Sequence, residues 1–385
     1  MNNNQRRPCL LCQSAKLSIV AQSSWTSMLV TSDLKLWPGS IDIAVCQHCG
    51  HAQKMIDDDY LRQVNEIYLN YQMYPASAGK EPAVFTDQSM RPRSEVVLKW
   101  LTDATSFPST GRMLDLGCGN GGALASFGAV NNCWELYGYE LDRKNEKSIL
   151  SIPGVKGFFT EGMDNIKGLF DLVTMFHLIE HLPEPVEFMN RVRELIAPGG
   201  LALIQSPDIT LNPFDFIIVD HCSHFSPGSM RYLTARSGFE TLHLRNDLAP
   251  KEISALVKSE KRGNIALGPE DKQAKSKVVS AIGWLENLAK DAAYHAQTQP
   301  FGILGTGIGG TWLAGILSDK VSFFIDEDPS RCGKIHLGKQ VISPLQAQED
   351  ACVYLPFPPA IAERIRERLS AVCPSVQMIC PPGLS

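Results

Sequence analysis

The chain has 385 residues, too many for one ordinary hydrophobic core, and this length predicts two or three domains. Its 44% hydrophobic and 20% charged residues are typical of a soluble globular protein. A net charge of −5 without a long basic stripe argues against a nucleic-acid-binding protein. The first residues lack the apolar run of a signal peptide. The most membrane-like stretch, Phe301–Leu317, holds six glycines and is short for a bilayer span, so we expect no membrane partner.

Four of the eleven cysteines form two pairs with the spacing of zinc ligands. Cys9 and Cys12 form one C-x-x-C pair, Cys46 and Cys49 form the other, and 33 residues separate the pairs. Two such pairs can place four thiolates around one tetrahedral zinc ion, and a closed shell of this kind predicts a structural site. The other interpretation, buried or reactive thiols without a metal, leaves the paired spacing unexplained. This cysteine usage indicates a cytoplasmic protein.

The zinc module is expected to cover residues 1–80 and to end in a helix that begins near Asp59. This helix leads into three tyrosines, Tyr68, Tyr71 and Tyr74. Their spacing suits one helical face, which favours packing against the next domain. The alternative is that one phenol reaches an active site as an acid or hydrogen-bond donor.

Residues 81–248 alternate strand and helix patterns, which predicts a doubly wound, Rossmann-like parallel sheet of the α/β class. The first strand ends at Asp115 and a helix follows from Asn120. We expect further strands at Trp134–Tyr139, Val155–Phe159, Phe170–Phe176 and Leu201–Gln205, and a helix at Glu184–Ile196.

The turn after the first strand reads DLGCGNGG and includes Gly117, Gly119 and Gly121, where backbone can approach a ligand closely. Glu140 ends the second strand, 23 residues after Gly117. An acidic residue at this place can accept both hydroxyls of an adenosine ribose. The pattern is therefore typical of a nucleotide-like cofactor site, and taken alone it fits NAD equally well.

The segments that follow in order are YGYELD, FFTEGM, FDLVTMFHLIEHLPEP and LIAPGGLALIQSPD. Together with DLGCGNG this series resembles the class I S-adenosylmethionine-dependent methyltransferases. The resemblance implies that the turn from Asp115 to Gly121 binds the methionine part and that Glu140 binds the ribose. It further implies that Glu161 or Gly162 lies near the adenine, and that Phe176 and His177 line the face where the methyl group is transferred.

The same region contains the pattern H-x-x-E-H at His177, Glu180 and His181, as in inverted zinc proteases. That chemistry needs both histidines on one helical turn. Here His177 follows a strong strand pattern and Pro183 comes soon after His181, which argues against a protease.

The apolar segment Pro213–Ser226 is interrupted by Asp220, His221 and His224. An isolated histidine on an apolar face is usually a core residue. A carboxylate beside an imidazole, however, can orient it or raise its basicity, as a general base requires. We therefore expect Asp220 and His221 to act together.

Residues 249–385 are expected to contain a linker helix, Lys275–Ala296, and a second, small α/β domain. Its glycine turn G-x-G-x-x-G consists of Gly305, Gly307 and Gly310, and Asp326 follows 21 residues after Gly305. This spacing is a passable dinucleotide fingerprint but a weak one. Strands at Ala351–Leu355 and Val376–Ile379 would complete a sheet of four or five strands.

This order of a four-cysteine zinc module, a methyltransferase core and a Rossmann-like domain with DEDPSRCGK resembles the sugar C-methyltransferases that act on nucleotide-linked keto-deoxysugars. The resemblance implies that Gly305, Gly307, Asp326 and Lys334 help to bind the nucleotide sugar. The family's Tyr-His-Glu-His-x-Ser-Tyr-Phe-Ser segment, laid without gaps from Phe214, puts its Glu-His pair on Asp220-His221. We thus expect His221 as the base, Asp220 as its partner, and Tyr74 or His177 as hydrogen-bond donors to an enolate.

The chain departs from the family segment where Ile218 and Val219 replace a tyrosine and a histidine, and where His224 replaces a second tyrosine. The methylated atom therefore stays open: carbon, or oxygen or nitrogen with His221 or His224 deprotonating the acceptor. Two competing functions are a nicotinamide-dependent oxidoreductase that uses Gly305–Gly310 and a non-catalytic scaffold. The sugar and the oligomeric state also stay open.

Overall fold

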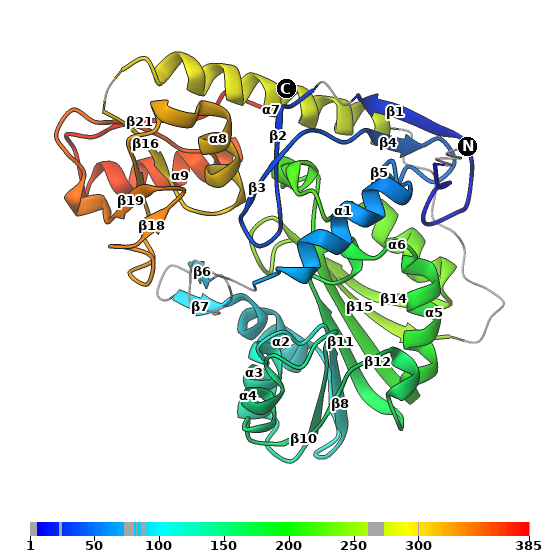
Figure 1. Ribbon diagram of the computed structural model, residues 1–385. Helices are drawn as coiled ribbons and strands as arrows, with labels where there is room; N and C mark the ends of the chain where they lie inside the picture. The colour runs from blue at the N-terminus through cyan, green and yellow to red at the C-terminus, as the bar shows by residue number, and fades with distance from the viewer. Residues whose placement is uncertain are drawn as a thin grey trace.

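The structure is a computed structural model (Figure 1) that describes residues 6–22, 25–72, 81, 83–85, 90–260, 273–298 and 300–384. Its three larger sheets have four, seven and six strands. Within the described residues, no helix is both long enough and apolar enough to cross a bilayer.

The N-terminal module is built on the four-stranded sheet, in the order β1-β4-β5-β13. Its own strands are β1 (Leu17–Ala21), β4 (Ile43–Cys46) and β5 (Ala52–Lys54), and all pairings in the sheet are antiparallel. The fourth strand, β13 (Ser223–His224), comes from a distant part of the chain and pairs with β5. The module is completed by a ribbon and a helix: β2 (Met28–Val30), β3 (Leu36–Pro38) and α1 (Asp58–Leu69).

The seven-stranded sheet has the order β10-β9-β8-β11-β12-β15-β14. Its first five strands are parallel: β10 (Val155–Phe159), β9 (Glu135–Tyr139), β8 (Arg112–Leu116), β11 (Phe170–Phe176) and β12 (Ile196–Pro207). The last two, β15 (Glu252–Ser259) and β14 (Phe239–Arg245), run antiparallel to their neighbours. The prediction of an all-parallel sheet was therefore wrong at this edge, and the sheet is mixed.

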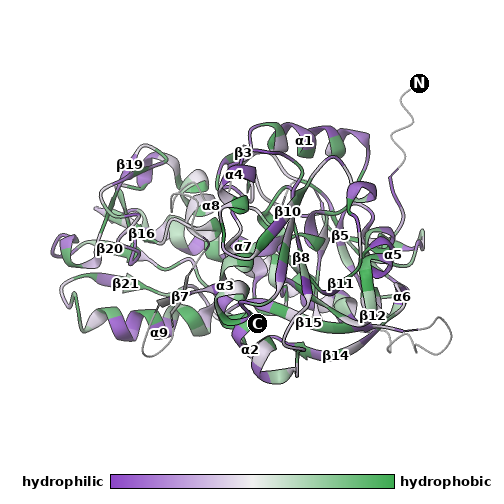
Figure 2. Cartoon of the chain, turned by 90° about the horizontal axis from the view of Figure 1, so that it is seen from below, coloured by the Kyte–Doolittle hydropathy of each residue, from purple (hydrophilic) through white to green (hydrophobic). Residues whose placement is uncertain are grey.

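Helices cover both faces of this sheet, because neighbouring residues on each buried strand point to opposite sides. Met113 and Leu172 pack with α2 (Arg93–Ala104) and α3 (Gly122–Val130), whereas Leu114 and Val173 pack with α5 (Pro185–Leu195) and α6 (Pro227–Arg236). Of these helices, α2 and α5 show both purple, hydrophilic and green, hydrophobic residues in Figure 2, as expected of helices with one buried face. The short elements of this region are β6 (Ala83–Phe85), β7 (Met90–Pro92), α4 (Glu146–Leu150), and the 3-10 turns η2 (Met163–Asn165), η3 (Ile179–His181) and η4 (Pro213–Ile217).

The C-terminal domain has a six-stranded sheet in the order β18-β19-β17-β16-β20-β21, more than the four or five strands expected. Only β18 is antiparallel to its neighbour within this sheet. Its elements are β16 (Phe301–Leu304), α8 (Ile308–Leu317), η5 (Ser318–Lys320), β17 (Phe323–Ile325), β18 (Ile335–His336), β19 (Lys339–Ile342), η6 (Pro344–Gln346), β20 (Cys352–Tyr354), α9 (Pro359–Ser370) and β21 (Gln377–Ile379).

The expected linker helix, α7 (Ala274–His295), is part of the hydrophobic core and packs against both the N-terminal module and the C-terminal domain. Its buried Trp284 and Leu285 belong to one hydrophobic cluster with Val45 of the N-terminal module, Phe214 of η4 and Trp312 of the C-terminal domain. The Trp312 indole also donates a hydrogen bond to the Met28 carbonyl, at 3.0 Å. The N-terminal module, η4 and the C-terminal domain therefore share a single core.

Candidate functional site

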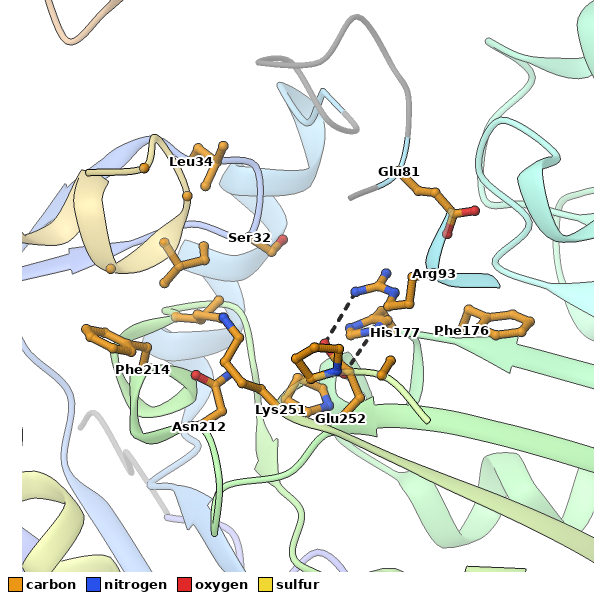
Figure 3. A pocket seen from close by; sticks show the side chains of 18 of the residues that line it. Ser32, Leu34, Glu81, Arg93, Phe176, His177, Asn212, Phe214, Lys251 and Glu252 are labelled. Carbon is orange, nitrogen blue, oxygen red and sulfur yellow. Dashed lines mark hydrogen bonds and ion pairs between the residues drawn. The ribbon is translucent and has the colours of Figure 1, made fainter. Parts of the chain in front are cut away.

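A cavity of about 930 Å³ lies between the carboxyl edge of the seven-stranded sheet and the C-terminal domain. In Figure 3, Phe176, Arg93 and His177 lie on one side, Ser32, Leu34 and Phe214 on the other, and Lys251 and Glu252 between them. The predicted site residues that line the cavity are Asp115, Gly117, Gly119, Phe176, His177, His221, Gly305, Gly307 and Asp326. Both predicted glycine turns thus line the same cavity.

The first glycine turn folds over the ends of β8 and β9. The amides of Gly117 and Cys118 both donate to the Tyr139 carbonyl, at 2.9 and 3.0 Å. The Gly119 amide donates to Oε2 of Glu140 at 3.0 Å. Gly117 has φ of +70°, and a Cβ there would lie 3.3 Å from the Leu178 side chain, so the turn requires glycine. The carboxylate of Glu140 and the open backbone of the turn fit a ribose-bearing cofactor.

Gly121 and Glu161 do not line the cavity. Gly121 is the N-cap of α3, where a Cβ would lie 2.4 Å from Ile152. Glu161 is exposed, with φ of +66°, and its carboxylate lies 3.6 Å from Arg143. Glu140 itself contacts the turn rather than the cavity.

Asp115 is buried beneath the first glycine turn. Its carboxyl accepts a hydrogen bond from the Thr174 hydroxyl at 2.6 Å. Burial raises the pKa of Asp115 to about 7, because desolvation of the carboxylate outweighs the hydrogen bond from Thr174. Asp115 is therefore a mixture of neutral and ionised forms near neutral pH.

His177 follows β11 with φ of +51°, a left-handed conformation that is rare outside glycine. Its Nε2 lies 3.1 Å from Glu252 and its Nδ1 lies 3.2 Å from Glu180. Burial and the Arg93 charge lower the pKa of His177, but the two glutamates outweigh them and raise it to about 9. The imidazole is therefore cationic at neutral pH. Arg93 completes the network through Glu252, at 3.4 Å.

His221 is oriented by Asp215, not by its neighbour in sequence. Nδ1 of His221 donates to Oδ1 of Asp215 at 2.7 Å, and Nδ1 of His224 donates to Oδ2 of the same carboxylate at 2.5 Å. Burial raises the pKa of Asp215, but the two imidazoles outweigh it and hold the pKa well below its usual range. The carboxylate can only accept, so each Nδ1 carries the proton. In the neutral tautomer of His221 the lone pair is therefore on Nε2, and the ring lines the cavity.

The predicted pairing of Asp220 with His221 was therefore wrong. The Asp220 carboxylate accepts from the Ser32 amide at 2.8 Å and lies 3.4 Å from Nδ1 of His181. Val219 and Asp220 form a turn, closed by a hydrogen bond from the His221 amide to the Ile218 carbonyl, so neighbours in sequence need not be in side-chain contact here. Asp220 instead links the segment that contains His221 to the β2–β3 turn, through Ser32, and to η3, through His181.

His224 lies on β13 and does not line the cavity. Burial and the nearby Lys54 charge lower its pKa to about 4, so the ring is neutral at physiological pH. Its Nε2 is buried and has no hydrogen-bond partner among the described residues. Tyr74 lies outside the described residues. Of the other two tyrosines, Tyr71 lines the cavity and the Tyr68 hydroxyl lies 3.0 Å from Nδ1 of His181.

The second glycine turn joins β16 to α8. A Cβ on Gly310 would lie 2.0 Å from the Gly305 carbonyl oxygen, so only glycine allows this close crossing. The Asp326 carboxylate accepts from the Thr306 amide at 3.0 Å and from the Thr306 hydroxyl at 2.8 Å. Arg331 lies 3.2 Å from the same oxygen. Thr306 and Arg331 thus both contact Oδ2 of Asp326, which lies directly after β17.

Three arginines that sequence reasoning missed line this end of the cavity, namely Arg331, Arg364 and Arg368. Arg368 pairs with both carboxylate oxygens of Glu327. Arg364 makes no ion pair with any described residue, and its Nε donates to the Ala360 carbonyl at 3.3 Å. Arg331 lies inside the DEDPSRCGK segment but was not singled out there, and Arg364 and Arg368 lie on α9 outside any motif. Lys334, which was expected near the nucleotide, is exposed and does not line the cavity.

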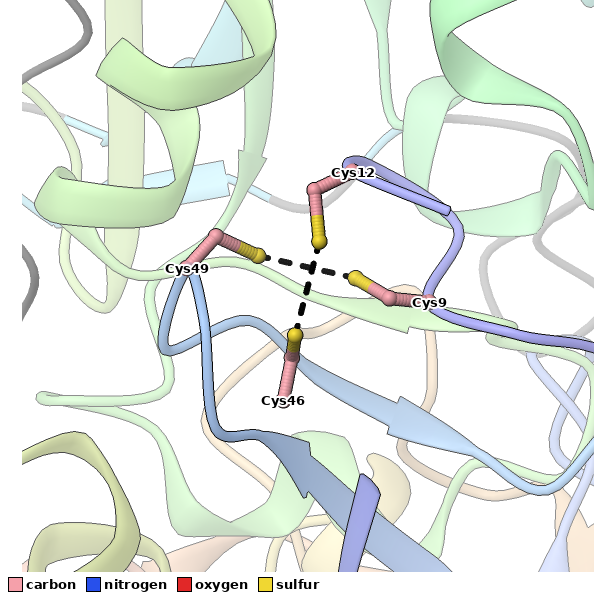
Figure 4. A group of neighbouring side chains, drawn as sticks. All are labelled: Cys9, Cys12, Cys46 and Cys49. Atoms are coloured by element: carbon pink, nitrogen blue, oxygen red, sulfur yellow. Dashed lines mark hydrogen bonds between the residues drawn. The ribbon is translucent and has the colours of Figure 1, made fainter. Parts of the chain in front are cut away.

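The four cysteines of the N-terminal module point toward one centre (Figure 4). Sγ of Cys9 lies 3.5 Å from Sγ of Cys49, and Sγ of Cys12 lies 3.5 Å from Sγ of Cys46. A tetrahedral zinc ion with Zn–S bonds of about 2.3 Å separates its sulfurs by about 3.8 Å. None of the four is in a disulfide. The donor set and its spacing therefore fit a zinc ion.

Comparison with known proteins matches residues 91–244 to a family model described as a methyltransferase domain. The C-methyltransferase NovU of Streptomyces niveus is 32% identical over 105 residues, which are 26% of this chain and 24% of that protein. A ubiquinone biosynthesis O-methyltransferase of Caulobacter sp. is 29% identical over 112 residues, 26% of this chain and 42% of that protein. The matches thus span less than half of either relative. The solved mitomycin 7-O-methyltransferase MmcR is 14% identical and covers 43% of this chain and 53% of its own, with a TM-score of 0.38.

Proposed function

From the premise that residues 91–244 are a class I methyltransferase domain, we propose that the protein transfers a methyl group from S-adenosylmethionine to a nucleotide-linked keto-sugar. One observation carries this proposal. Gly117 and Gly119 of the first turn and Gly305 and Gly307 of the second line the same cavity, and His221 lines it with them. A methyl donor on the first turn and an acceptor on the second would meet beside a base.

The donor half of the cavity is expected to bind S-adenosylmethionine at the turn from Asp115 to Gly121, with Glu140 at the ribose and Glu161 near the adenine. When bound, this cofactor supplies an electrophilic sulfonium methyl group. Phe176 and His177 line the cavity beside the turn and would shield this group from water. The positive charge of His177 is balanced by Glu180 and Glu252, so the site stays close to neutral around the sulfonium.

The acceptor half combines a helix N-terminus with arginines. Gly307 is the N-cap of α8 and no side chain caps it, so the first amides of the helix are free for an anion. Arg364 lines the cavity without an ion-pair partner among the described residues. A diphosphate is the anion that such an arrangement binds well. Gly305, Gly307 and Arg364 are therefore our candidates for holding the nucleotide, and Asp326 with Arg331 would fix the turn.

The base in this proposal is Nε2 of His221. Asp215 keeps the proton on Nδ1, so the lone pair on Nε2 can remove a proton from the carbon beside a ketone. The resulting carbanion would attack the methyl group in line, a step that the enzyme promotes chiefly by positioning. Both N–H groups of His177 face glutamates, so its positive charge beside the cavity, rather than a hydrogen bond, would stabilise the enolate oxygen. His224 assists by sharing the Asp215 carboxylate.

Oxygen methylation is the second candidate, because the relatives include O-methyltransferases as well as a C-methyltransferase. The same Nε2 of His221 would then deprotonate a hydroxyl group. The NAD-dependent alternative rests on the spacing of Gly305–Gly310 and Asp326 alone, whereas the methyltransferase domain model matches residues 91–244.

We also propose that Cys9, Cys12, Cys46 and Cys49 bind a structural zinc ion, an assignment supported by their spacing and free thiols. All eleven cysteines are unpaired, which supports the expectation of a reducing, cytoplasmic location.

Two measurements test the proposed function. S-adenosylmethionine or its demethylated product should raise the melting temperature, as any native-state ligand does. No shift at saturating cofactor would refute cofactor binding. Incubation with nucleoside-diphosphate keto-deoxysugars and methyl-labelled cofactor should then give a methylated sugar, and NMR of the label would separate carbon from oxygen methylation. Cofactor binding without turnover on any member of the panel would favour the scaffold.

A further inference from the structure

Three side chains meet beside the cavity in a second arrangement that is suited to a metal ion. They are Glu180 and His181, from the 3-10 turn η3 that follows β11, and His221, from the segment after η4. One potential ligand atom of each lies within 4.8 Å of the others. Both histidines line the cavity, and Glu180 is fully buried behind them.

Each of the two imidazoles is held at Nδ1 by an aspartate. His221 donates to Oδ1 of Asp215 at 2.7 Å. Nδ1 of His181 lies 3.1 Å from the Asp220 carbonyl and 3.4 Å from its carboxylate. Metal-binding histidines typically donate one ring N–H to a carboxylate or carbonyl, which fixes the ring and leaves the other nitrogen for the metal. Nδ1 of His181 also lies 3.0 Å from the Tyr68 hydroxyl, and with the ring proton on Nδ1 in both histidines the nitrogen left over is Nε2.

The Glu180 carboxylate lacks the hydrogen bonds that a buried anion needs. Its residue exposure is 0%, and neither carboxylate oxygen has a hydrogen-bond partner among the described residues. The contact that comes nearest is an ion pair of Oε1 with Nδ1 of His177, at 3.2 Å. A buried carboxylate without hydrogen bonds is costly unless a cation compensates it. Cationic His177 supplies part of that compensation, and a bound divalent ion would add a direct bond to a carboxylate oxygen of Glu180.

We propose that Glu180, His181 and His221 bind one divalent ion of the zinc type, at a site separate from the four cysteines. Two imidazole nitrogens and one carboxylate oxygen are ligands that zinc accepts in sites with an open position. The open position would face the cavity, since both histidines line it. Asp215 and Asp220 would hold the two histidines in the orientation for binding.

The ion and the proposed base compete for one lone pair. Nε2 of His221 removes the proton in the proposed reaction, and the same atom is the metal ligand here. Occupancy of the site therefore inhibits methyl transfer. This consequence rests on the proposed function, whereas metal binding itself does not.

The binding test uses the full chain with the cysteine site filled, at one zinc per chain. Addition of zinc, followed by calorimetry and by metal analysis after gel filtration, should show a second equivalent. Glu180→Gln and His181→Ala should each weaken the second site by more than about 10-fold and retain the first zinc. His243→Ala removes an exposed histidine outside the cavity and should bind two equivalents like the unaltered chain.

The proposed site would be overturned if the unaltered chain bound only one zinc ion. It would also be overturned if Glu180→Gln and His181→Ala both still bound two zinc ions. A cofactor-induced rise in melting temperature identifies which variants are folded, and either folded variant suffices for the comparison.

The activity test adds zinc to a turnover assay. Turnover should fall as the second equivalent binds and should return when a chelator removes that equivalent alone. Unchanged or increased turnover with two bound equivalents would overturn the competition at His221. If turnover is absent at every zinc concentration, the proposed function fails, and the metal titration still decides the site.

Discussion

Asp215, which lies six residues before His221 in the chain, accepts a hydrogen bond from Nδ1 of His221 at 2.7 Å. The same carboxylate accepts from His224, so one buried anion fixes the proton positions of two imidazoles. His221 lines the cavity and His224 does not. The Asp215 carboxylate therefore connects the imidazole of the proposed base, His221, to a buried imidazole outside the cavity, His224.

The first prediction concerns this carboxylate. Asp215→Asn can donate from its amide to Nδ1, which moves the ring proton of His221 to Nε2 and removes the lone pair of the base. We expect kcat to fall by about 100-fold or more, the usual contribution of general base catalysis. The affinity for S-adenosylmethionine should stay nearly constant, because Asp215 does not line the cavity.

The matched control is Asp220→Asn, which alters a carboxylate that contacts Ser32 and His181 instead. Its kcat should fall less than that of Asp215→Asn in the same assay. Equal losses in both variants would mean that the pairing with His221 has no special role.

The second prediction concerns Asp115 and pH. Its pKa is raised to about 7 in the native state, against about 3.9 for an unfolded chain. Between these values the native protein binds the extra proton, so the contribution of Asp115 to stability falls as pH rises through this window. Asp115→Asn cannot ionise and keeps an acceptor for Thr174.

Urea denaturation of both proteins from pH 4 to pH 9 checks this. The stability of Asp115→Asn relative to the unaltered chain should rise by up to about 1.4 kcal/mol per pH unit below pH 7 and level off above it. A difference that is independent of pH would show that Asp115 ionises normally in the folded protein.

The third prediction separates the two halves of the cavity. Arg364→Ala should raise KM for a nucleotide-linked acceptor by about 10- to 100-fold, the effect of one hydrogen bond to a charged group. Cofactor affinity should not change. Arg366→Ala is the matched control, since Arg366 lies on the same helix, pairs with Glu363 and does not line the cavity. Equal KM values for both variants would place the phosphates elsewhere.

The fourth prediction tests the cysteine cluster. Cys46→Ser should lose bound zinc, lower the melting temperature and reduce turnover, because β4 leads through β5 to β13 beside His221. Metal analysis, thermal melting and the activity assay measure the three effects. Cys133→Ser removes an exposed cysteine and should leave all of them unchanged. A fully active Cys46→Ser protein without zinc would contradict the structural role.

Several strands of the fold could be predicted from sequence because their apolar runs are bounded by clear turns. The strand Phe170–Phe176 was predicted with the bounds that the structure gives to β11, and Val155–Phe159 with those of β10. The strand β15 was missed, since its neighbours in sequence are polar and lysine-rich. Its antiparallel direction depends on a pairing with β12 that no local pattern reveals.

The candidate site could be predicted only in part, because sequence shows neighbours along the chain and not across space. Motifs located both glycine turns, Glu140 and His221. The partner of His221 depends on how η4 folds back, and the Asn212-Pro213 step was the one local sign of a turn there. Arg93 and Glu252 are 159 residues apart and belong to no motif. Only the folded chain brings them to His177.

The pairing of β5 with β13 has a consequence for how this protein can be divided. Ser223 and His224 pair with Gln53 and Ala52. The segment that carries His221 is therefore hydrogen-bonded into a sheet whose other strands precede the methyltransferase domain. A fragment that begins at Arg91 would retain the donor-side turn but not the scaffold of the base. Transplanting the methyltransferase domain into another protein should therefore carry over cofactor binding without catalysis, unless residues 6–72 travel with it.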